Sequence, residues 1–305
     1  VLNGKTINHD GSESGQALVI QITESDKAGD VGNVSGNIAK SISFTESQTF
    51  TGNVQSLTST IENSVTVTAA ADEFDAKTVN GAGQLTLTGT GTGGTDLSNI
   101  SADILDITGA NLSAGVTFAS TISSGDEIKA TAAQVTGKTI AGAGVLTISG
   151  TASDTNFSAL TAAVVDVTAA TLNGTSNFGS AIAEGDEFRF TAAQVTGKTI
   201  GGAGTKTITK LNADLDADLS NISSGTITAA FEDDGTFTGD LGSATVTVTD
   251  SKTMTAGYSV LNGKTINHDG SESGQALVIQ ITESDKAGDV GNVSGNIAKS
   301  ISFTE

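Results

Sequence analysis

The stretch TAAQVTGKTIAGAGVLTIS, residues Thr131–Ser149, indicates the fold because most of it returns further along the chain. TAAQVTGKTI stands at Thr131–Ile140 and again at Thr191–Ile200, and each copy runs into Gly-Ala-Gly and a short alternating segment. Internal repetition of this kind indicates a repeat architecture in which every copy contributes one structural module.

A larger repeat contains this smaller one. Val1–Glu46 is identical to Val260–Glu305, so the chain reads as one period of 259 residues, 1–259, followed by the start of the next, 260–305. This overlap predicts a slice of a tandem array. Each period contains four related units of 60 to 72 residues, whose KT motifs place their lysines at Lys77, Lys138, Lys198 and Lys264.

Each unit divides into three segments of about 22 residues, and each segment opens with apolar residues alternating with Thr, Ser or Lys. Such alternation, rich in β-branched residues, is typical of a strand with one buried face. Clusters of Gly, Asn, Asp and Ser follow and supply turns. Pairs at the alternating apolar positions are Val65 and Val67, Leu85 and Leu87, Leu146 and Ile148, Phe188 and Phe190, and Val246 and Val248.

Short strand-turn modules repeated at this length predict an all-β parallel solenoid of about twelve coils per 259-residue period. Its narrow core would consist mainly of small aliphatic side chains. The alternative is a tandem array of small β-sandwich domains, which usually contain a large aromatic core residue. The sequence has no Trp and no Pro, and 4% of its residues are aromatic, so the solenoid is favoured.

The composition excludes several classes of partner. The formal net charge is −20 with 14 basic residues, which disfavours nucleic acid and anionic lipid and suits divalent cations. No apolar run approaches the eighteen residues of a spanning helix, so the chain is not expected to cross a membrane. Cysteine is absent, which excludes disulfides and thiolate metal sites.

Two motifs resemble calcium sites. Gly201–Thr209 reads GGAGTKTIT, which matches the glycines of a calcium roll but has Lys206 where the ligand Asp belongs, and Leu85 and Leu146 occupy the equivalent positions. The glycine turn is therefore expected without its metal chemistry. The other motif, DLDAD, spaces three carboxylates as at the start of a calcium loop, although the Gly and closing Glu of such a loop are missing. Its calcium candidates are Asp214, Asp216 and Asp218, and a solvated acidic turn is the alternative interpretation.

Other acidic turns have the same two interpretations, solvated turn or cation site; they begin at Ser124, Ala183 and Phe231. Catalysis has little support. His9 and His268 are one position of the repeat, in an NHDGS segment whose residues are typical of turns. Arg189 is the only arginine, so a groove with clustered acidic and basic side chains, as an enzyme of this fold would use, is not expected. The sequence therefore predicts no enzyme.

The richness in Thr, Gly, Ala and Asp, the lack of Cys and units such as VTGKTIAGAG resemble the repetitive regions of giant secreted bacterial surface proteins. These are β-strand-repeat adhesins and S-layer-like or filament-forming proteins. The resemblance covers the whole chain and implies a non-catalytic, extracellular or cell-surface polymer that forms a filament, sheath, coat or stalk. The alternative is an adhesin stalk that presents a separate binding domain, and either form has a variant in which calcium stiffens the rod.

The expected partner is the protein itself, by head-to-tail stacking or by covalent continuation of the array. An open solenoid end exposes unpaired strand edges, which need a cap or invite end-to-end joining. No cap is recognisable in the sequence.

Overall fold

The computed structural model describes residues 5–8, 10, 16–26, 31, 34–91, 94–112, 117–119, 121–179, 182–269, 274–283 and 290–304. The chain forms two compact units, Val1–Ala152 and Ser153–Glu305. The predicted division into 1–259 and 260–305 follows the period of the sequence, and the boundary between the compact units lies within that first period.

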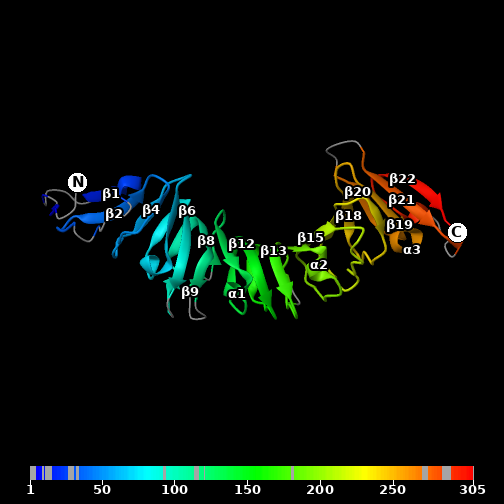
Figure 1. Ribbon diagram of the computed structural model, residues 1–305, viewed down its shortest axis with the longest axis horizontal. Helices are drawn as coiled ribbons and strands as arrows, with labels where there is room; N and C mark the ends of the chain where they lie inside the picture. Colours follow the sequence, from blue (N-terminus) through cyan, green and yellow to red (C-terminus); the bar gives the residue numbers. More distant parts are fainter. Residues whose placement is uncertain are drawn as a thin grey trace. The chain divides into compact units, whose positions relative to one another are not determined.

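The first unit consists almost entirely of strands, with helical segments of one turn (Figure 1). In chain order these are β1 (Ala17–Ile22), η1 (Glu24–Asp26), β2 (Ala39–Phe44), β3 (Gln48–Thr49), β4 (Ser59–Ile61), β5 (Thr66–Ala70), η3 (Ala71–Phe74), β6 (Val79–Gly91), β7 (Asp96–Leu97), β8 (Ile100–Leu112), β9 (Thr117–Phe118), β10 (Thr121–Ile122), β11 (Glu127–Thr131), α1 (Ala132–Val135) and β12 (Ile140–Ser153).

The second unit repeats this organisation. Its elements are β13 (Leu160–Asn173), β14 (Glu187–Thr191), α2 (Ala192–Val195), β15 (Thr205–Leu211), β16 (Ile227–Phe231), β17 (Gly235–Phe237), β18 (Thr245–Val248), β19 (Thr253–Gly257), α3 (Tyr258–Leu261), β20 (Thr265–His268), β21 (Ala276–Ile281), η5 (Val290–Asn292) and β22 (Ala298–Phe303).

Every strand pairing that we describe is parallel. Partners lie from 17 residues apart, as in Ile42 with Ser59, to 23 residues apart, as in Val164 with Glu187. Within each unit, each coil therefore stacks directly on the coil before it. The predicted β-solenoid is confirmed, with about 13 turns over the described residues of the two units. The alternative of small β-sandwiches is wrong, because their sheets are antiparallel.

The predicted alternation also places the core correctly. The paired residues Val67, Leu85 and Leu105 all point inward from successive coils and are buried, as are Phe190 and Ile208 of the second unit. The core contains more large aromatic side chains than the predicted core of small aliphatic residues. The largest fully buried side chains of the described residues include Phe44, Phe50, Phe74, Phe157, Phe190, Phe231 and Phe237.

The Gly-Ala-Gly motif forms a corner where the chain passes from one face of the coil to the next. Its first glycine has a positive φ, +106° at Gly81 and +113° at Gly142, which other residues rarely adopt. Its second glycine lies against the preceding coil: a Cβ on Gly83 would be 2.7 Å from the carbonyl oxygen of Val65. Both glycines are therefore required by the close stacking of coils.

The repeated TAAQ segment forms a one-turn helix whose Gln side chain is hydrogen-bonded to an earlier coil. In α1, Thr131 N donates to Gln134 Oε1 at 2.7 Å and Gln134 N donates to Thr131 Oγ1 at 3.3 Å, which is a capping box. Gln134 Nε2 then donates to the carbonyl oxygens of Ile107 and Ala110 at 2.8 and 2.7 Å. Gln194 Nε2 of α2 likewise donates to the carbonyl oxygens of Val167 and Ala170, both at 2.7 Å, so the Gln side chain links each one-turn helix to an earlier coil.

Candidate functional sites

Lys206 is the most unusual side chain of the described core. It points inward from β15 in a column with Phe188 and Ile227, and none of it is exposed. The ammonium group donates to carbonyl oxygens on two successive coils. Its acceptors are Gly202, Gly204 at 3.2 Å, Ser223 at 3.4 Å and Ser224 at 2.8 Å.

Burial lowers the pKa of Lys206, because a charged group loses hydration inside the protein. No carboxylate among the described residues forms an ion pair with it. The carbonyl oxygens therefore supply the compensation that a buried charge needs, through charge-assisted hydrogen bonds. The sequence pointed to this position, since Lys206 aligns with Leu85 and Leu146, but it did not reveal what the ammonium group would contact.

The calcium candidates of the DLDAD segment lie in a turn region after β15. Asp214 and Asp216 are exposed, and Asp216 Oδ1 accepts a hydrogen bond from Thr238 Oγ1 at 3.0 Å. Asp218 Oδ1 accepts one from the backbone of Ser220 at 3.0 Å, and hydrogen bonds to Ser220 lower the pKa of Asp218. The described residues contain no group of three or more His, Cys, Asp or Glu arranged to hold a metal ion. Calcium binding stays a prediction.

The other acidic turns use several of their carboxylates within the fold. Glu187 accepts a hydrogen bond from Arg189 Nη2 at 2.9 Å and one from Thr207 Oγ1 at 2.6 Å, and the bond from Arg189 is the main cause of its lowered pKa. Near Phe231, Asp234 Oδ1 accepts the amide of Thr253 at 2.7 Å. These contacts favour the interpretation as structural turns.

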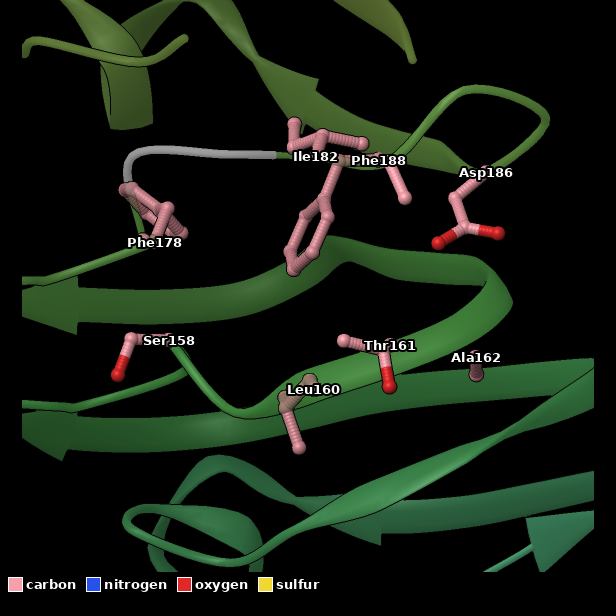
Figure 2. A pocket seen from close by; sticks show the side chains of 10 residues that line it. Ser158, Leu160, Thr161, Ala162, Phe178, Ile182, Asp186 and Phe188 are labelled. Carbon is pink, nitrogen blue, oxygen red and sulfur yellow. The ribbon is translucent and has the colours of Figure 1, made fainter. Parts of the chain in front are cut away.

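A small cavity in the second unit lies between two coils (Figure 2). Phe178 and Asp186 stand at opposite sides of it, with Ile182 and Phe188 between them and Leu160 on the facing coil. Its volume is about 20 Å³, which accommodates one water molecule and no organic ligand. Burial raises the pKa of Asp186, because the partly buried carboxylate has lost hydration.

A broader polar hollow of about 320 Å³ is lined by Asn262 and Lys264 of the Asn-Gly-Lys turn and by residues near Asp240 and Ser259. Its polar groups are already engaged: Lys264 Nζ donates to the carbonyl oxygen of Gly242, and Asp240 Oδ1 accepts the amide of Gly242 at 2.8 Å. Asn262 Oδ1 accepts Tyr258 OH at 3.1 Å. The lining therefore stabilises the turn and leaves few groups to recognise a ligand.

One copy of the repeated histidine, His268, lies among the described residues. His9 lies outside them. His268 ends β20 and its backbone amide donates to Asn296 Oδ1 at 3.0 Å, while its Nδ1 atom is buried without a hydrogen-bond partner. The neighbouring Asp269 accepts from Gln275 Nε2 at 2.9 Å. The described part of the NHDGS segment is the end of β20, Asn267 and His268, followed by Asp269, so the predicted turn lies largely outside the described residues.

Comparison of the chain with models of protein families, with curated proteins and with solved structures found no match. Among the described residues, no helix combines the length and the apolar character that crossing a membrane requires.

Proposed function

We propose that this protein is a non-catalytic structural repeat protein whose coils stack into a filament, sheath, coat or stalk outside the cell or on its surface. Its partner is then further copies of its own coils, joined within one long chain or between chains. The strongly negative charge, −20, keeps such a polymer soluble and makes nucleic acid an improbable partner.

One observation carries this proposal: the chain repeats its coils and pairs each with the next in parallel register. In the second unit, Glu187 pairs with Thr205, Thr228 with Thr245, and Thr245 with Thr265. The stability of such a stack is a sum of nearest-neighbour interfaces, so length can grow with the number of repeats without a new design. This architecture therefore suits a protein whose role depends on its length.

Electron microscopy of the chain, and of chains lengthened by one and by two periods of 259 residues, tests the proposal. We expect slender rods whose length increases by a constant increment per period, and regular fibres as the concentration rises. Compact particles whose diameter grows in all directions would contradict a solenoid polymer.

The same images separate the filament from the adhesin stalk. A filament or coat predicts association of rods into regular assemblies. A stalk predicts separate rods at all concentrations, and melting in the presence of a chelator then tests whether calcium stiffens them. An unchanged melting temperature would remove the calcium-stiffened form.

A further inference from the structure

The chain contains one strand twice, in two environments. β2 and β22 both have the sequence AKSISF. In β2, the side chains of Ile42 and Phe44 are 1% and 0% exposed, whereas the equivalent Ile301 and Phe303 of β22 are 47% and 81% exposed. The identical sequence means that only the surroundings can cause this difference.

The surroundings on one side are the same for both strands. β2 pairs with β1 from Ala17 with Ala39 onward, and β22 pairs with β21 from Ala276 with Ala298 onward, in the same register. The hydrogen bonds that close this pairing also correspond: Thr45 N donates to the carbonyl oxygen of Ile22 at 3.2 Å, and Thr304 N to that of Ile281 at 3.0 Å. β22 therefore presents the same outer edge as β2.

On the other side, β2 is covered by the next coil. β4 pairs with it in the register Ile42 with Ser59, Ser43 with Thr60 and Phe44 with Ile61. The Phe50 ring of that coil packs edge-on against Phe44, with centroids 5.2 Å apart. Ile42 N donates to the carbonyl oxygen of Thr58 at 3.0 Å, and Ser43 Oγ donates to Glu62 Oε1 at 2.8 Å.

No strand of the described residues covers the outer edge of β22, which lies at the C-terminal end of the second unit in Figure 1. We propose that this edge is a docking strand for a coil with the sequence of residues 47–62, in the register Ile301 with Ser59, Ser302 with Thr60 and Phe303 with Ile61. The inference rests on the proposed function and names the partner: a further copy of one particular coil. Phe303 then packs against the copy of Phe50.

The outer edge of β1, at the start of the repeat, fits a different coil from the outer edge of β22. β21 is covered by β19, with Thr253 paired with Ala276 and Thr255 with Val278, and Leu277 is fully buried. In β1, which has the same sequence, Leu18, the counterpart of Leu277, is only half-buried, and Val19 is 55% exposed where its counterpart Val278 is half-buried. The outer edge of β1 therefore matches β19, and the outer edge of β22 matches residues 47–62.

Hydrogen exchange on the full chain, extended after Glu305 by a copy of residues 47–91, tests the docking strand. We expect the amide of Ile301 to exchange fast in the original chain and to slow in the extended chain until it matches the amide of Ile42. The control is the same extension carrying Phe50→Asp and Ile61→Asp in the added copy, which should leave Ile301 fast. An Ile301 amide equally fast in both extended chains would overturn the proposal.

A crosslink checks the register independently of exchange rates, because the chain has no cysteine of its own. Ser302→Cys combined with Thr60→Cys in the added copy places two cysteines on neighbouring strands about 4.8 Å apart, which a disulfide can bridge. The control is Thr58→Cys in place of Thr60→Cys, which lies two residues out of register. We expect rapid oxidation of the first pair and little of the second; equal oxidation, or the reverse order, would overturn the register.

The two proposals fail separately. If the chain forms regular fibres while Ile301 stays unprotected and the crosslink does not form, the polymer stands and the docking strand is wrong. If the crosslink forms and rods never lengthen with added periods, the docking strand stands and the proposed function is wrong.

Discussion

The corner at Leu85 and the corner at Lys206 share the Gly-Ala-Gly motif but satisfy their backbones differently. At Leu85, β6 runs through the corner, and Gly81 pairs with Ala102 of the next coil. At Lys206, β15 begins only after the corner, and carbonyl oxygens of its own coil and the next accept hydrogen bonds from the ammonium group. This difference shows how the solenoid accommodates a charged core residue. At the Lys206 corner, backbone carbonyl oxygens accept hydrogen bonds from the ammonium group, whereas at the Leu85 corner the backbone pairs with the next strand.

The next coil differs in step with the core residue. The segment Asn99–Asp103 follows Leu85 as NISAD, and Asn221–Gly225 follows Lys206 as NISSG. Gly225 has a φ of +64°, a conformation that its counterpart Asp103 does not share. The charged residue and the altered turn therefore form one unit, and variants that change only one of them should be unstable.

The largest effect is expected from Leu85→Lys, which places a charge in the corner whose carbonyl oxygens are paired within the sheet. We expect the free energy of unfolding to fall by roughly 4 kcal/mol, since burial without compensation shifts a lysine pKa by several units. Urea denaturation measures it. Leu85→Met is the matched control and should cost about 1 kcal/mol. Equal stability of the two variants would show that the Leu85 corner can also rearrange around an ammonium group.

A smaller loss is expected from Gly204→Ala, because the new Cβ would lie 2.6 Å from the carbonyl oxygen of Asp186. Such overpacking against backbone should cost about 3 kcal/mol, measured by urea denaturation. Gly197→Ala is the control: no atom lies within 4 Å of its Cβ, and only its φ of +67° is unfavourable, for about 1 kcal/mol. The proposed role of Gly204 in stacking requires this difference between the two variants.

Lys206→Leu reproduces the residue found at both sister corners, and we still expect it to destabilise the protein by about 2 kcal/mol. The carbonyl oxygens around the ammonium group would lose their hydrogen-bond donor, and no backbone amide of a neighbouring strand would replace it. Thermal unfolding measures the change, with Lys210→Leu on the outer surface as the control. A variant more stable than the parent would mean that the ammonium group costs more in hydration than its hydrogen bonds return.

The smallest effect is expected from Asp186→Asn. Burial raises the pKa of Asp186, so the folded protein holds this proton more tightly than the unfolded chain does. The carboxyl group therefore favours folding fully in acid, below its unfolded pKa, and this contribution is lost as the pH rises through its folded pKa. The variant should be slightly more stable than the parent at neutral pH and no more stable in acid. Melting curves across this range, with Asp214→Asn as the exposed control, test the sign.

Much of the fold could be predicted because stacking leaves a direct trace in the sequence. The alternation at Leu85 and Leu87 reports one buried strand face, and the glycines at Gly81 and Gly83 report a corner too tight for a side chain. The one-turn helices were missed although Thr131 and Gln134 have the spacing of a capping box. A single turn is too short to produce a helical period of apolar residues.

The candidate sites were harder to predict, because they depend on contacts between coils. The carbonyl oxygens around Lys206 come partly from Ser223 and Ser224, and nothing in the local sequence shows that they converge. The phenylalanines are another example: Phe157, Phe178 and Phe190 come from different coils, yet Phe178 contacts both of the others. Composition gives their number and not their clustering.

The repeated strand AKSISF separates what the sequence determined from what the tertiary structure decided. The sequence by itself determined that both copies form a parallel strand with the same register to the preceding coil, because alternation and turn residues are local properties. Only the tertiary structure decided that Phe44 is buried against Phe50 of the following coil, with ring centroids 5.2 Å apart. Burial depends on which coil stacks above a strand, and that neighbour is not encoded within the strand.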